Sequence, residues 1–133
     1  MKPKVYIDGK DGTTGLQIYD RLAARDDIDL LLIDEDKRKD PAERKKLMAA
    51  ADIVFLCLPD AAAVEAVVLA EGTGARIIDA STAHRTAPGW VYGFPELRPG
   101  QREAIAKAKY VANPGCHATG FISIAAPLVQ AGL

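Results

Sequence analysis

The sequence has few cysteines, histidines and aromatic residues, and no excess of charge of either sign. Its 133 residues include two cysteines and two histidines, and aromatic residues make up 6%. Cys57 and Cys116 allow one disulfide at most, and no Cys/His cluster has zinc-site spacing. The 17 Lys and Arg residues against 18 Asp and Glu residues give a formal net charge of −1, with no basic stripe. We therefore expect no metal site and no nucleic-acid or anionic-membrane partner.

Long hydrophobic runs and an apolar leader are missing as well. The longest stretch without a charged residue, 110–133, is interrupted by glycine, proline and asparagine, so it does not predict a membrane-spanning helix. The first four residues lead directly into a strand-like run, without a signal region. These absences favour a cytoplasmic location. With 49% hydrophobic and 26% charged residues, the composition predicts one folded domain over residues 1–133.

Short apolar runs alternate with helix-like segments along the whole chain. Strands are expected at 5–7, 28–33, 53–58, 76–80 and 110–112, and helices at about 16–23, from 41, and at 61–70, 101–109 and 116–131. The run 28–33 is almost continuously apolar, which predicts a strand buried on both faces. Asp40 and Asp60 are expected to cap the helices that follow them, and 81–99 is expected to form loops. The alternation predicts an α/β fold, a Rossmann-like doubly wound and mostly parallel sheet.

Three glycines with the spacing Gly-x-x-Gly-x-x-Gly follow the first predicted strand. In Gly9, Gly12, Thr13, Thr14 and Gly15, small residues let the backbone approach a ligand closely. Backbone N–H groups of such a loop and of the helix after it can bind a pyrophosphate. The loop therefore predicts an NAD(P)-binding site, and the alternative is a turn of a doubly wound protein without a cofactor.

The end of the second predicted strand should meet the adenosine ribose of such a cofactor. Asp34 could accept a hydrogen bond from a ribose 2′-hydroxyl, which favours NAD, whereas Arg38 and Lys39 could pair with the 2′-phosphate of NADP. The residues alone leave both cofactors open. Leu58 and Pro59 end the third strand, where a doubly wound sheet forms its ligand crevice, so they are further candidates for cofactor contact.

Cys116 begins the last predicted helix, directly after the turn 113–115. Free N–H groups and the positive end of the helix dipole stabilise a thiolate there and can also bind an oxyanion. This position predicts a nucleophile, with a structural cysteine as the alternative. We expect Cys57, inside an apolar strand, to pack in the core. Because neighbouring residues on a helix do not face each other, we do not expect His117 to act as the base.

Polar residues follow the fourth predicted strand. Ser81 and Arg85 lie in a hydroxyl-rich segment at the crevice end of this strand, and a guanidinium there suits a phosphate or carboxylate. The alternative for Arg85 is a surface salt bridge. His84 lies beside it without a predicted role.

Four segments together resemble the N-acetyl-gamma-glutamyl-phosphate reductases of arginine biosynthesis, especially their shorter-chain type. These segments are the Gly9–Gly15 loop, Asp79–Arg85, Tyr92–Leu97 and Asn113–Cys116, and the resemblance extends over essentially the whole chain. It implies NADPH-dependent reduction of an acyl phosphate, N-acetyl-L-glutamyl 5-phosphate, to the 5-semialdehyde with release of phosphate.

The same resemblance implies roles for individual residues. Cys116 would be the nucleophile, and substrate contacts would come from Ser81, Arg85, Glu96 and Asn113. A family preference for NADP favours Arg38 and Lys39 over Asp34. His117 departs from the tyrosine that many relatives have at this position.

The family also has a second, mostly β domain with an acid/base histidine and the subunit interface. We therefore expect this chain to be an N-terminal portion or one chain of a split enzyme, inactive alone, with the full-length enzyme a homo-oligomer. Two alternatives remain open: an enzyme like aspartate-semialdehyde dehydrogenase, which shares the loop, the cysteine and the acyl-phosphate chemistry, and a nucleotide-binding domain without chemistry.

Overall fold

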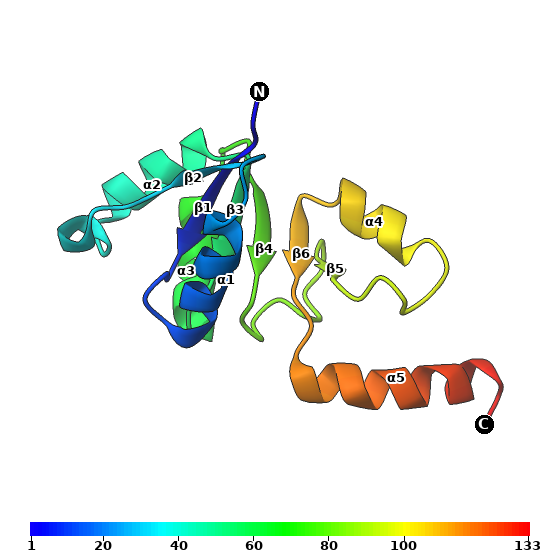
Figure 1. Cartoon of the computed structure of the whole chain (residues 1–133). Coiled ribbons are helices and arrows are strands. Elements are labelled where there is room, and N and C mark those ends of the chain that lie inside the picture. The colour runs from blue at the N-terminus through cyan, green and yellow to red at the C-terminus, as the bar shows by residue number, and fades with distance from the viewer.

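A six-stranded sheet organises the chain. The computed structural model describes residues 1–133, and its strands lie in the order β2-β1-β3-β4-β6-β5 (Figure 1). The strands are β1 Lys4–Asp8, β2 Asp29–Leu31, β3 Ile53–Leu56, β4 Arg76–Asp79, β5 Val91–Tyr92 and β6 Tyr110–Ala112. Every neighbouring pair is parallel, so all six carboxyl ends lie at one edge.

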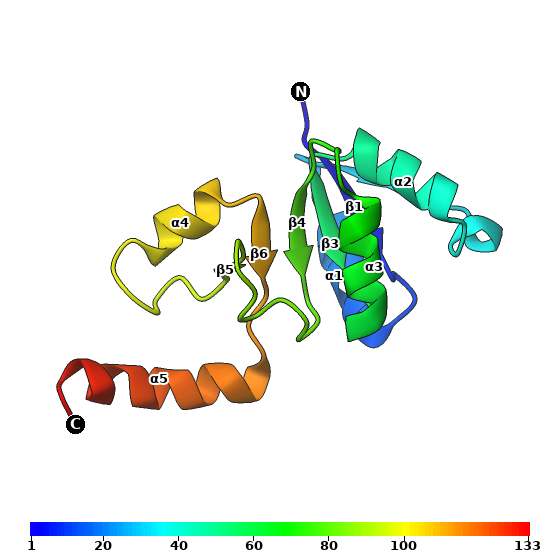
Figure 2. The ribbon, with the colours of Figure 1, turned by 180° about the vertical axis from the view of Figure 1, so that it is seen from behind.

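Five α-helices and a short 3-10 helix join these strands. They are α1 Thr13–Ala23, η1 Glu35–Lys37, α2 Pro41–Ala50, α3 Asp60–Leu69, α4 Gln101–Lys107 and α5 Cys116–Gln130. Helix α1 lies in front of the sheet in Figure 1 and α3 behind it, and the reverse view exchanges them (Figure 2). The prediction of a doubly wound α/β sheet is therefore confirmed. No helix combines the length and apolar character needed to cross a membrane.

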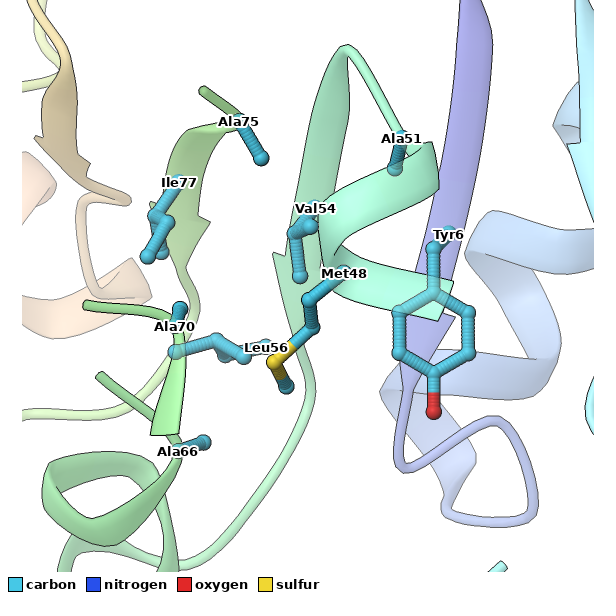
Figure 3. Packing of buried hydrophobic residues seen from close by; sticks show 9 residues of the cluster. All are labelled: Tyr6, Met48, Ala51, Val54, Leu56, Ala66, Ala70, Ala75 and Ile77. Atoms are coloured by element: carbon cyan, nitrogen blue, oxygen red, sulfur yellow. The ribbon is translucent and has the colours of Figure 1, made fainter. Parts of the chain in front are cut away.

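The hydrophobic core lies between the sheet and the helices α2 and α3 (Figure 3). Its members are Tyr6, Met48, Ala51, Val54, Leu56, Ala66, Ala70, Ala75 and Ile77. Met48 from α2, and Leu56 and Ile77 from the sheet, are at most 1% exposed. Burying a side chain of this size stabilises the fold by about 1.5–3 kcal/mol. Alanines on α3 leave room for these larger side chains, which fixes the helix close to the sheet.

Several sequence predictions need correction. The second strand is shorter than 28–33, and its residues are exposed or half-buried, so it is not buried on both faces. It is an edge strand with β1 as its only neighbour, and Leu32, which follows it, is 56% exposed. The third strand ends at Leu56. Strand β5 lies within the segment expected to form loops, since two residues are too few to show an alternating pattern.

The two predicted helix caps differ in outcome. The Asp40 carboxylate accepts a hydrogen bond from the Ala42 N–H at 2.9 Å, as predicted. Asp60 is wrong as a cap: it is the first residue of α3, and its carboxylate accepts hydrogen bonds from the N–H and hydroxyl of Thr82 instead. These bonds join the start of α3 to the loop after β4.

Helix α5 contains no buried residue and extends away from the sheet in both views (Figures 1 and 2). Its apolar side chains are exposed, including Phe121 at 72% and Ile124 at 70%. Its first turn nevertheless begins only three residues after β6, so Cys116 lies near the sheet edge.

Candidate functional site

The residues singled out in the sequence converge on the carboxyl edge of the sheet. Residues 9–15 follow β1, residues 57–59 follow β3, residues 81–85 follow β4, and Cys116 comes shortly after β6. Ligands of doubly wound folds bind outside this edge. The strand order therefore aligns a glycine loop, a crevice and a thiol along one side of the molecule.

The glycine loop needs glycine at two of its three glycine positions, Gly9 and Gly15. Gly9 has φ +88°, and a Cβ there would overlap the Cys57 carbonyl oxygen. A Cβ on Gly15 would overlap the Gly9 carbonyl oxygen and lie 2.8 Å from the Lys10 Cα. Gly12 has more room and forms the N-cap of α1 without any side-chain cap. The first-turn N–H groups of α1 are therefore free to face an anion.

Two cavities flank this loop and share Leu58. The larger, of about 320 Å³, lies beyond β1 and β3 and includes Gly9 and Leu58 in its lining. The smaller, of about 280 Å³, is lined by Gly12, Thr13, Thr14, Cys57, Leu58 and Ala80. Pro59 lines neither cavity. An adenosine at the first cavity and a pyrophosphate at the α1 N-terminus would suit this arrangement.

Four basic residues line the larger cavity, and three of them have partners. Arg38 forms an ion pair of 2.6 Å with Asp11 of the glycine loop, Arg44 pairs with Asp8, and Lys10 lies 5.1 Å from the centre of the Tyr19 ring. Lys39 forms no hydrogen bond or ion pair. Asp34 does not line the cavity; its carboxylate accepts from Lys37 at 3.3 Å.

The pair of Asp8 and Arg44 is the buried electrostatic contact of this cavity. The Arg44 guanidinium donates from Nε and Nη2 to the Asp8 carboxylate, and the two side chains are 15% and 4% exposed. The Tyr6 hydroxyl donates to Asp8 at 3.3 Å. Burial and the charge of Asp8 raise the pKa of Tyr6, so its hydroxyl remains a donor. This contact fixes the cavity floor.

The prediction that Cys57 packs in the core is only partly right. Cys57 comes one residue after β3, is half-buried and lines the smaller cavity. Burial, followed by the charges of Asp8 and Asp79, raises the pKa of Cys57 to about 11. A thiol with this pKa carries little thiolate near neutral pH, so we expect it to react slowly there.

Cys116 is the first residue of α5, as predicted, and it is exposed. Gly115 is the N-cap and supplies no side-chain cap, so the N–H groups of this turn are also free. The Cys116 Sγ lies 3.6 Å from the Nδ1 of His117, which contradicts the expectation that adjacent side chains do not approach each other. The helix spacing rule concerns side chains that share a helix face, and it does not exclude a contact between neighbouring side chains at the first two positions of a helix.

Arg85 brings a positive charge to the same turn. A Cβ on Gly115 would lie 2.5 Å from Nη1 and 3.0 Å from Nη2 of Arg85, so the guanidinium lies against the backbone that precedes the thiol. The Arg85 side chain forms no hydrogen bond, and its buried Nε has no partner. The alternative of a surface salt bridge is therefore wrong. A guanidinium without a partner beside free N–H groups is suited to bind an anion.

A buried polar network holds the segment that carries Arg85. Asp79, which is 0% exposed, accepts from the backbone N–H and the hydroxyl of Ser81 at 2.9 and 2.7 Å. Its carboxylate also lies 2.6 Å from the Nδ1 of His84, whose ring stacks on Trp90 at 4.1 Å. Ser81 therefore positions the loop and is itself buried.

The remaining two predicted substrate residues occupy different environments. The Asn113 N–H donates to the Asp79 carbonyl at 2.8 Å, which places this exposed residue at the sheet edge before Cys116. Glu96 pairs with Arg102 at 3.2 Å and lines a groove with the later turns of α5, residues 122–130. Its contacts are not with the turn that carries Cys116.

The sequence prediction assigned no individual role to four residues of this edge: Asp11, Arg44, Asp79 and Gly115. A sequence signal for Asp79 exists, because an acid at the end of an apolar strand followed by Ser and His predicts a buried hydrogen-bond network. No local signal exists for the ion pairs of Asp11 and Arg44, since their partners are 27 and 36 residues away. No cluster of three or more His, Cys, Asp or Glu side chains could hold a metal ion.

Comparisons with known proteins agree with this geometry. Residues 33–108 match the family described as semialdehyde dehydrogenase, NAD binding domain. The chain is 60% identical over 132 residues to an N-acetyl-gamma-glutamyl-phosphate reductase of Trichormus variabilis, covering 99% of this chain and 41% of that protein. It is 58% identical to the reductase of the same name from Brucella ovis, covering 100% of this chain and 43% of the relative.

A solved structure shares the fold. Aspartate semialdehyde dehydrogenase II from Vibrio cholerae superposes with a TM-score of 0.72 at 17% identity, covering 98% of this chain and 43% of that one. The chain thus spans about two fifths of the length of the proteins it matches. Since the family match extends over more than half of its residues, the chain belongs to the family of semialdehyde dehydrogenase NAD-binding domains.

Proposed function

We propose that this chain provides the cofactor site and the nucleophile of an NADP-dependent N-acetyl-gamma-glutamyl-phosphate reductase. The observation that carries the proposal is the Arg85 guanidinium, which has no partner and lies against Gly115 beside the exposed Cys116 thiol. The two reductase relatives, at 60% and 58% identity over essentially the whole chain, support this substrate class. The aspartate enzymes share only the fold, at 17% identity.

The residues at the β6 end would form and stabilise a thioester. The Cys116 thiolate attacks the acyl carbon, the new carbon–sulfur bond forms, and the bond from carbon to the phosphate oxygen breaks with its electron pair leaving on phosphate. N–H groups at the start of α5 face the developing oxyanion. Arg85 neutralises the phosphate, and a guanidinium does so with two parallel donors. Ser81 and Asp79 keep the Arg85 segment in place.

The residues at the β1 and β3 ends fit a dinucleotide. The cavity of about 320 Å³ takes the adenosine, and the uncapped N-terminus of α1 takes the pyrophosphate. Arg38 and Lys39 line this cavity and Asp34 does not, which favours a 2′-phosphate and hence NADP. When bound, the reduced nicotinamide supplies the hydride that converts the thioester to the aldehyde.

A chimera tests the reaction. In this chimera, the chain replaces the matching residues of the Trichormus variabilis reductase. The remaining part of that protein is needed because we expect it to supply the acid/base histidine and the subunit interface of a homo-oligomer. We expect NADPH oxidation that depends on N-acetyl-L-glutamyl 5-phosphate, and its loss in the Cys116→Ala chimera. Preference for aspartyl phosphate would instead support an aspartate-semialdehyde dehydrogenase.

Alkylation of the chain itself tests the anion site. Inorganic phosphate should slow the reaction of Cys116 with iodoacetamide, and Arg85→Gln should abolish this protection. Arg102→Gln is the matched control, since it removes an arginine that pairs with Glu96 on the surface. Equal protection in all three proteins, or none in any, would support a nucleotide-binding domain without this chemistry.

A further inference from the structure

The ion pair between Asp11 and Arg38 connects two walls of the larger cavity. Asp11 belongs to the glycine loop between Gly9 and Gly12, and Arg38 follows η1 in the segment that joins β2 to α2. The Arg38 Nη1 donates to the Asp11 Oδ2 at 2.6 Å, and both residues line the cavity. Their side chains are 51% and 49% exposed. The pair thus lies at the cavity rim, where a ligand can reach it.

Arg38 is the exchangeable arginine of this cavity. Arg44 is held by a buried bidentate contact with Asp8, so a ligand that took it would leave the Asp8 charge buried and unpaired. Asp11 is different, because water can solvate its carboxylate when Arg38 leaves. An exposed pair of this kind contributes little, and breaking it changes a binding constant by at most about fivefold.

Resting on the proposed function, we propose that Asp11 is a specificity-determining residue that competes with the cofactor 2′-phosphate for Arg38. A dianionic phosphate must displace Asp11 to take both Nη donors of Arg38. Lys39, which has no partner, provides the initial attraction. A cofactor with a 2′-hydroxyl leaves the Asp11–Arg38 pair intact.

The Asp11–Arg38 pair therefore weakens the binding of NADP but not of NAD. It reduces the difference in affinity between the two cofactors. Removing the Asp11 charge should strengthen the binding of ligands that carry the 2′-phosphate. Ligands without it should bind as before, since their contacts with the uncapped α1 N-terminus do not involve the Asp11 side chain.

Binding constants of the chain for NADPH, NADH and adenosine 2′,5′-bisphosphate test this proposal by calorimetry at low ionic strength. We expect Asp11→Asn to bind NADPH and the bisphosphate about fivefold more tightly, with NADH unchanged. Asp27→Asn is the matched control, because Asp27 forms an equally exposed pair with Arg25 and does not line the cavity. It removes the same charge and should change none of the three constants.

A second background distinguishes competition from a general charge effect. In Arg38→Ala, adding Asp11→Asn should no longer strengthen NADPH binding, since the residue for which Asp11 competes is gone. A persisting increase, or an equal gain for NADH, would overturn the proposal. If the wild type binds NADPH and Asp11→Asn does not bind it more tightly, this inference alone fails. If the wild type binds none of the three ligands, the proposed cofactor site fails with it.

Discussion

The half of the chain that forms the glycine loop and the half that carries Cys116 are held together by different forces. Of the fourteen buried hydrophobic residues, only Val111 and Ala112 follow residue 80. The later half depends on polar contacts instead. Arg76 donates to three carbonyls at the end of α4, and the Gln101 amide donates to the Tyr92 carbonyl.

This difference means that the first half provides most of the stability of the fold and the second half provides the reactive groups. Packing in the first half holds together the strands and helices that carry the larger cavity. The second half places a thiol and a guanidinium at the sheet edge through a few directed hydrogen bonds, while most of α5 remains exposed. Substitutions should therefore affect unfolding in the first half and local chemistry in the second.

Truncation of one side chain in each half gives the largest expected contrast. Met48 is fully buried, whereas Phe121 is 72% exposed. We expect Met48→Ala to lower the free energy of unfolding by about 3 kcal/mol through lost burial and a cavity. Phe121→Ala should change it by no more than about 0.5 kcal/mol. Urea unfolding followed by circular dichroism measures both, and equal losses would contradict the division.

The two cysteines report on the same contrast in chemical terms. With its pKa raised to about 11, Cys57 carries little thiolate near neutral pH. We expect Cys116 to react with iodoacetamide at least about a hundredfold faster near pH 7. Because the raised pKa lies above the working range, the rate at Cys57 should rise about tenfold per pH unit until about pH 11. Peptide mass spectrometry assigns each site, and comparable rates near neutral pH would refute the prediction.

Two glycines sharpen the comparison at the level of the backbone. A Cβ on Gly15 would overlap backbone atoms that cannot move aside, whereas nothing lies within 4 Å of a Cβ on Gly120 in α5. We expect Gly15→Ala to destabilise the chain by about 2 kcal/mol. Gly120→Ala should stabilise it by up to about 1 kcal/mol, because alanine favours the helix. The urea midpoints of the two variants and the wild type measure both effects. A Gly15→Ala variant as stable as the wild type would show that the loop can rearrange.

The smallest effect concerns one of the contacts that join the two halves, between Asp60 and Thr82. The side-chain and backbone hydrogen bonds from Thr82 lower the pKa of Asp60. A lowered pKa means that the contribution of Asp60 to stability is present above its unfolded pKa and is lost as the pH falls through its folded pKa. Asp60→Asn should therefore be slightly less stable near neutral pH and lose less stability below about pH 4. Parallel acid titration curves of the two proteins would contradict this.

Local patterns predicted the architecture and most of the edge residues. Alternating strands and helices, the Gly9 and Gly15 positions and the Asp40 cap follow from neighbours in the sequence. The edge position of β2 and the existence of β5 depend on long-range pairing, which a short window cannot show. The ion pairs of Arg38 and Arg44 could not be predicted for the same reason, because their partners are distant in the sequence. Asp60 was predicted wrongly because an aspartate at the start of a helix can either cap that helix or accept hydrogen bonds from a distant loop. The local sequence is the same in both cases.

The strand order also sets the distance between the glycine loop and Cys116. The glycine loop follows β1 and the thiol follows β6, with β3 and β4 between them, so three strand spacings of about 14 Å in total separate the two strand ends. In the proposed binding mode the pyrophosphate lies at the β1 end, so the nicotinamide nucleotide beyond it must extend along the sheet edge toward Cys116. The sheet thereby sets the length of the molecule that can bring a reactive ring to Cys116, before any side chain selects its chemistry.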